Sequence, residues 1–168
     1  GSVRGKITTG SVPEELKPAY VHKSRPLSEI LVQLLIASNN YIANQVFLEI
    51  GGTLGGPVSL EKSLKVANTM LAANGLAEDI HLEEGSGISR GNRFTARGLA
   101  KVLDLFAPHA ELLHGHDGGL NKTGTMSGVS TLAGYADTSK HGRVRFVISL
   151  KSNGSMRFRL LKAIEAGL

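Results

Sequence analysis

Apolar residues in the middle of the chain recur at spacings of three and four, the pattern of helices that bury one face. The first such run comprises Leu27, Ile30, Leu31, Leu34 and Leu35. A second run comprises Ile42, Val46, Phe47 and Ile50. Between them stand Ser38, Asn39 and Asn40, whose short polar side chains favour helix ends and turns. The pattern therefore predicts two helices that meet at residues 38–40.

Three further helices are indicated where a serine or threonine precedes apolar residues at helical spacing, because such side chains cap a first turn. Ser59 precedes Leu60, Leu64, Ala67 and Leu71. Thr95 precedes Leu99, Val102, Leu103 and Phe106. Ser155 precedes Phe158, Leu161 and Ile164. All three hydroxyl residues are predicted N-caps.

The last third of the chain is rich in β-forming residues. Residues 129–136 and 143–150, joined by the turn-prone residues 137–142, predict a hairpin. Lys122 stands at the start of another strand, and short strands are expected at residues 4–9 and 79–82. This order of helices, strands and a final helix indicates an α+β fold, with helices packed on a largely antiparallel sheet.

The length of 168 residues fits one domain. Gly1-Ser2 is typical of the scar that a cleaved expression tag leaves. Residues 3–26, punctuated by Pro13, Pro18 and Pro26, are expected to form a short strand and a linker. Residues 27–168 are expected to form the domain.

Composition narrows the possible partners. The net charge is +5, but the basic residues are dispersed and no stacking aromatics alternate with them, which disfavours nucleic acid as a partner. A mildly basic surface suits an anionic polymer such as cell wall. No apolar run is long enough to form a transmembrane segment, and the absence of cysteine leaves the redox compartment open.

The stretch Lys122-Thr123-Gly124-Thr125 has the most distinctive chemistry. An ammonium and hydroxyls at the start of a strand can hold a carboxylate, and Gly124 lets ligand backbone approach the strand closely. A metal site at His114, His116 and Asp117 is the weaker reading of the preceding loop, because real sites need three or four supported ligands. No metal or cofactor is expected. Glu83 and Glu84 are interpreted as structural.

Three motifs, in order and with their flanks, resemble the D-Ala-D-Ala carboxypeptidase/endopeptidase family of low-molecular-mass penicillin-binding proteins. They are Ser38-Asn39-Asn40, residues 84–90 (Glu-Gly-Ser-Gly-Ile-Ser-Arg) and Lys122-Thr123-Gly124-Thr125. The resemblance runs from about residue 24 to the end of the chain. It implies the downstream part of a transpeptidase domain of the serine β-lactamase and penicillin-binding-protein type.

The resemblance also implies roles for the site residues. A serine attacks the D-Ala-D-Ala peptide carbonyl to form an acyl-enzyme; Ser38 relays a proton to the leaving amine and Asn40 binds the substrate amide. Lys122 supplies positive charge, while Thr123, Gly124 and Thr125 receive the terminal carboxylate. The expected partners are peptidoglycan stem peptides ending in D-Ala-D-Ala and β-lactams, in the periplasm or cell envelope.

The chain departs from the family pattern in three places. Glu84 replaces an aspartate, and the segment between Phe106 and Lys122 is shorter. The nucleophile motif Ser-x-x-Lys, which the family places before Ser-x-Asn, does not precede Ser38 here. The one Ser-x-x-Lys, Ser59 to Lys62, follows Ser38 and is explained by a capping serine at a helix start.

Two functions therefore stay open. The first is part of a serine carboxypeptidase or endopeptidase that is inactive as this chain alone. The alternative is a non-catalytic module that binds peptidoglycan peptides or a partner chain. Because the family's upstream segment would cover apolar surface near Ser38, we also expect an exposed patch and self-association.

Overall fold

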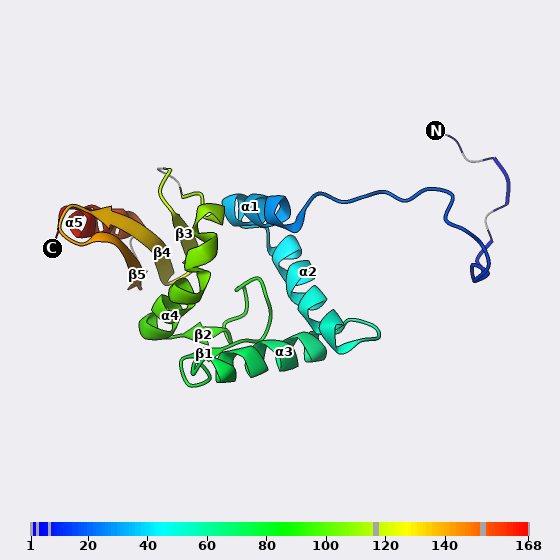
Figure 1. The fold of residues 1–168 in the computed structure, drawn as a ribbon, viewed down its shortest axis with the longest axis horizontal. Coiled ribbons are helices and arrows are strands. Elements are labelled where there is room, and N and C mark those ends of the chain that lie inside the picture. The colour runs from blue at the N-terminus through cyan, green and yellow to red at the C-terminus, as the bar shows by residue number, and fades with distance from the viewer. Residues whose placement is uncertain (1, 3, 7, 116–117, 152–153, 168) are drawn as a thin grey trace.

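The structure is a computed structural model that describes residues 2, 4–6, 8–115, 118–151 and 154–167. Its α-helices are α1 (Leu27–Ala37), α2 (Asn40–Gly51), α3 (Leu60–Ala73), α4 (Ala96–Phe106) and α5 (Gly154–Glu165), shown in Figure 1. Two 3-10 helices are η1 (Gly52–Leu54) and η2 (Ala107–Leu112). The strands are β1 (Ile80–His81), β2 (Arg93–Phe94), β3 (Asn121–Met126), β4 (Val129–Thr138) and β5 (Gly142–Leu150). The predicted α+β class is confirmed.

The N-terminal segment runs away from the helices as an exposed, extended arm (Figure 1). The strand expected at residues 4–9 does not form in its described part, residues 4–6 and 8–9, and residue 7 lies outside the described residues. A β-strand needs a neighbouring strand to receive its N–H and C=O groups, and this arm lies beside none. That expectation was wrong for the residues described.

The main sheet has the order β3-β4-β5, and both pairings are antiparallel. The predicted hairpin of β4 and β5 is confirmed, with both strands longer than expected. Gly134 is needed where β4 passes the start of β3, because a Cβ there would lie 2.2 Å from the Leu120 carbonyl oxygen. The Tyr135 amide donates to that same carbonyl over 2.9 Å. β1 and β2 form a separate two-stranded ladder.

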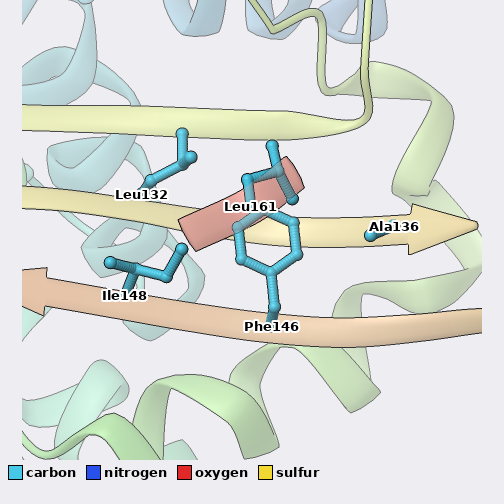
Figure 2. Packing of buried hydrophobic residues seen from close by; sticks show 5 residues of the cluster. All are labelled: Leu132, Ala136, Phe146, Ile148 and Leu161. Atoms are coloured by element: carbon cyan, nitrogen blue, oxygen red, sulfur yellow. The ribbon is translucent and has the colours of Figure 1, made fainter. Parts of the chain in front are cut away.

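One face of the main sheet is covered by α5. Side chains on alternate positions of β4 and β5 meet Leu161 of that helix in a buried cluster, seen in Figure 2. The cluster comprises Leu132, Ala136, Phe146, Ile148 and Leu161, with Phe158 and Ile164 packed against it. The inward residues predicted for the last helix are thereby confirmed.

The opposite face of the sheet packs against α4, η2 and α1. Its buried cluster comprises Leu103, Ala110, Leu113 and Tyr135, and Leu35 of α1 packs against it. The Tyr135 hydroxyl donates to the Leu103 carbonyl at 2.5 Å, which satisfies a buried polar group. Through Leu35, this cluster holds the end of α1 close to the sheet.

Most predicted helix starts agree with the structure. The Ser59 hydroxyl accepts from the Lys62 amide, and the Thr95 hydroxyl accepts from the Gly98 amide. Ser155 differs, because α5 already begins at Gly154 and Ser155 lies within its first turn. No helix in the described part of the chain is long and apolar enough to cross a membrane.

Two adjacent leucines of α5 give a matched test of this core. Leu161 is 8% exposed and packs on the sheet, whereas Leu160 is 37% exposed. Leu161→Ala is expected to lower the free energy of unfolding by about 2–5 kcal/mol, because it opens a cavity. Leu160→Ala is expected to cost less than about 1 kcal/mol. Urea unfolding curves measure both values, and equal losses would contradict the packing of α5.

Candidate active site at the junction of α1, α2 and β3

Ser38 occupies an unusual backbone conformation at the end of α1. Its φ and ψ are 51° and 48°, in the left-handed region, and it is the single non-glycine residue with positive φ among the residues described. Such a conformation costs about 1–2 kcal/mol for a residue with a Cβ. It lets Asn39 follow as the N-cap of α2, where the Asn39 side chain accepts a hydrogen bond from the Ile42 amide at 3.0 Å. The predicted helix junction is confirmed.

Lys122 connects this junction to β3. Its Nζ lies 2.5 Å from the Ser38 Oγ and 2.8 Å from the Thr123 carbonyl oxygen. Partial burial lowers the pKa of Lys122, and the positive charge of Arg157 lowers it further. Its ammonium donates to both oxygens, so the Ser38 hydroxyl oxygen accepts a charge-assisted hydrogen bond from Lys122.

These groups line one cleft of about 750 Å³, a volume typical of ligand sites. Its walls are the helix junction, β3 from Lys122 to Met126, and the loop at residues 85–90 with residues 92–94 after it. All six residues predicted for the site line it: Ser38, Asn40, Lys122, Thr123, Gly124 and Thr125. The structure therefore brings the two motifs together, while the roles assigned to their residues stay predictions.

Glu84 organises the loop that forms the third wall. Its carboxylate accepts hydrogen bonds from the backbone amides of Ser86, Gly87 and Ser89, and from the Ser86 hydroxyl and the Asn92 amide group. Partial burial raises the pKa of Glu84, but these hydrogen bonds outweigh it and bring the pKa to about 2. The interpretation of Glu84 as a structural residue is confirmed.

The same loop is tied to the walls on either side of it. The Gly85 amide donates to the Asn44 side chain of α2 at 2.9 Å, and a Cβ at Gly85 would lie 2.4 Å from the Phe47 Cβ. At the other end, Arg90 Nη2 donates to the Ser127 carbonyl at 2.9 Å, just after β3. These contacts fix the loop between α2 and the β3–β4 turn.

The Ser-x-x-Lys at Ser59 and Lys62 does not line the cleft. The Ser59 hydroxyl caps α3, and Lys62 Nζ donates to the carbonyls of Gly55 and Pro57 at 2.7 and 2.8 Å. Both groups are thus engaged in local structure, as the capping interpretation expects.

Arg157 of α5 is a residue near the site that sequence reasoning missed. Its Nη1 donates to the Gly124 carbonyl and the Thr125 hydroxyl, each at 3.1 Å. The sequence gives no signal for this contact, since it depends on how α5 lies on the sheet. Of the loop considered for a metal, His116 and Asp117 lie outside the described residues. The residues that the structure describes contain no group of three potential metal ligands.

The sequence matches the model of one protein family over more than half of the chain. Residues 1–117 match the model of the D-Ala-D-Ala carboxypeptidase 3 (S13) family. The chain belongs to this family. The match includes Ser38 and Asn40, and it ends before Lys122. The resemblance stated from the motifs is thereby confirmed.

Alignments with curated relatives cover nearly all of this S13 chain. The D-alanyl-D-alanine carboxypeptidase of Actinomadura sp. (strain R39) is 32% identical over 91% of this chain and 34% of its own length. D-alanyl-D-alanine carboxypeptidase DacB of Haemophilus influenzae is 25% identical over 95% of this chain and 39% of its own length. The chain thus spans between a third and two fifths of these relatives.

The fold of the chain is similar to part of the fold in two solved structures. Penicillin-binding protein 4 (DacB) of Haemophilus influenzae, complexed with a β-lactam, superposes with a TM-score of 0.67 at 25% identity, covering 86% of this chain and 41% of that one. The Bd0816 predatory endopeptidase of Bdellovibrio bacteriovorus, complexed with immunity protein Bd3460, superposes with a TM-score of 0.57 at 26% identity. That alignment covers 83% of this chain and 41% of the endopeptidase chain.

The hydrogen bonds to Glu84 make stability depend on acidity. A carboxylate with a lowered pKa stabilises the folded state fully above its ordinary value of 4.5, and this contribution disappears as the pH falls through about 2. Glu84→Gln is expected to lower the free energy of unfolding at neutral pH by about 1–2 kcal/mol, a value reduced for partial exposure. It is also expected to flatten the decline between pH 4.5 and 2.

Urea unfolding at several pH values measures this dependence. Glu78→Gln, at an exposed glutamate, is the matched control and is expected to keep the wild-type profile. A wild-type profile in the Glu84→Gln variant would show that the loop does not depend on this carboxylate.

Proposed function

We propose that this chain forms the carboxylate-binding and proton-relay side of a serine D-Ala-D-Ala carboxypeptidase/endopeptidase active site. The observation behind the proposal is the contact between Lys122 Nζ and Ser38 Oγ, which joins two motifs from distant parts of the sequence. Lys122, on the edge strand β3 and in contact with the helix junction, presents positive charge to a cleft of suitable size. Membership of the S13 family supports the same reaction class.

Each site residue has a proposed part in this reaction. Ser38, hydrogen-bonded to Lys122, passes a proton to the leaving amine, and Asn40 binds the substrate's amide. Lys122 and the hydroxyls of Thr123 and Thr125 bind the terminal carboxylate of the stem peptide. A backbone N–H of β3 near Thr125 stabilises the oxyanion that develops on the attacked carbonyl.

The nucleophile completes the proposed acyl-enzyme mechanism. A serine oxygen attacks the D-Ala-D-Ala carbonyl, the C–N bond breaks, and D-Ala departs after its amine gains a proton; water then hydrolyses the ester. In the family the nucleophile belongs to a Ser-x-x-Lys motif, and the single such motif in this sequence begins at Ser59. Because Ser59 does not line the cleft, we assign the nucleophile to a segment outside this sequence. The chain's share of the relatives' length is in keeping with that assignment. By itself, this chain would bind substrate without turnover. Its proposed location is the periplasm or cell envelope.

A non-catalytic peptide-binding module is the second candidate. It is favoured by a separate observation: the residues for binding a carboxylate line the cleft, while the single Ser-x-x-Lys, at Ser59 and Lys62, serves local structure. Both candidates predict ligand binding in the cleft. They differ in whether the complete protein cleaves the peptide.

Titration with N-acetyl-D-Ala-D-Ala, followed by NMR, tests the binding that both candidates require. Shifts are expected at Ser38, Asn40 and residues 122–125, with no release of D-Ala. Lys122→Met is expected to weaken binding about tenfold to a hundredfold, because a charge-assisted hydrogen bond contributes about 1.5–3 kcal/mol. Lys151→Met removes the same charge from an exposed position and is expected to bind like wild type.

The peptide amide, which lacks the terminal carboxylate, is the ligand control and is expected to bind weakly to every variant. Shifts confined to another surface, or equal affinity of Lys122→Met and wild type, would contradict the proposed carboxylate site.

A further inference from the structure

Arg157 places a second cation behind the proposed carboxylate site. It lies in the first turns of α5, and its Nη1 is within 3.0–3.1 Å of four acceptors on β3 and β4. These acceptors are the Gly124 and Thr131 carbonyls and the hydroxyls of Thr125 and Ser130. No carboxylate among the described residues forms an ion pair with it. Apart from these acceptors, its guanidinium carbon lies 5.0 Å from the centroid of the Phe158 ring, and no described carboxylate neutralises its charge beside the site.

The position of Arg157 relative to Lys122 follows from the register of the sheet. Thr125 pairs with Ser130, and Ser130 lies two residues from Leu132, which packs under α5. Both hydroxyls thus lie on the face that α5 covers. Lys122 pairs with Ala133, which packs in the cluster on the opposite face. The two cations accordingly flank the edge strand β3 from opposite faces.

The chemistry of the guanidinium determines what Thr125 can do. Arginine donates hydrogen bonds and accepts none, so the Thr125 oxygen acts as acceptor toward Arg157. The hydroxyl proton of Thr125 is then left to donate to another group. Thr125 is an exposed residue of the edge strand β3 and lines the cleft, so a ligand carboxylate bound at this edge would accept a hydrogen bond from that hydroxyl.

We propose that Arg157 is a positioning residue for the carboxylate site, which orients the Thr125 hydroxyl as a donor toward the bound carboxylate and adds positive charge behind it. Arg157 does not line the cleft and acts through Thr125. This inference rests on the proposed function, since it assigns a further residue to the same site.

The test is titration of the whole chain with N-acetyl-D-Ala-D-Ala and with its C-terminal amide. Arg157→Gln is expected to weaken binding of the carboxylate form about tenfold, because it removes the positive charge and the charge-assisted hydrogen bond that orients Thr125. The weak binding of the amide is expected to stay unchanged. Arg159→Gln, an exposed site on the same helix, controls for net charge and is expected to bind like wild type. Arg157→Lys, which keeps a cationic donor, is expected to recover most of the lost affinity.

A double-mutant cycle with Thr125→Val separates positioning from a structural role. If Arg157 acts through the hydroxyl, Arg157→Gln loses much less affinity in the Thr125→Val background than in wild type. Additive losses, or a carboxylate affinity that Arg157→Gln does not change, would overturn the inference and leave the proposed function intact. Absence of binding by the wild-type chain would overturn both.

Should Arg157→Gln fail to fold, as judged by circular dichroism, the wild-type chain itself decides. The guanidinium Nε–H signal of Arg157 is expected to shift on saturation with the carboxylate peptide, whereas that of Arg159 stays in place. An unshifted Arg157 signal in the saturated chain would overturn the proposal.

Discussion

The contact between Lys122 and Ser38 is the interaction on which the arrangement of the site depends. It joins the end of α1 to the edge strand of the sheet, two elements far apart in the sequence. The sheet itself consists of two consecutive hairpins, β3–β4 and β4–β5, whose pairing involves no residue of α1 or α2. The position of the helix junction does need the packing of Leu35 on the sheet cluster, because that packing brings Ser38 within reach of the lysine.

The site also depends on a backbone conformation that is unfavourable in itself. Ser38, which joins α1 to the cap of α2, adopts left-handed dihedral angles that are more usual for glycine. A strained residue of this kind persists only where surrounding contacts determine it, and here they are the Asn39 cap of α2 and the hydrogen bond to Lys122. The Glu84 loop, fixed to α2 and to the β3–β4 turn, supplies a wall that is ordered by its own hydrogen bonds.

The sequence was sufficient where the signals are local. Helical spacing and capping residues located α1 to α5, and alternation with turn residues located the β4–β5 hairpin. The expected strand at residues 4–9 did not form in its described part because local β-propensity supplies no pairing partner. Motif order indicated which residues line the cleft, but Arg157 could not be found in this way. Its contact with Thr125 arises from the angle at which α5 crosses the sheet, which is a property of packing.

The central claim is that the helix junction and β3 meet across one cleft, and a nuclear Overhauser measurement on the wild-type chain tests it most directly. The account predicts a cross-peak between the side-chain ε-protons of Lys122 and the β-protons of Ser38, since Nζ and Oγ are 2.5 Å apart. Assigned signals from both residues without a cross-peak would contradict it, because the two motifs would then lie apart.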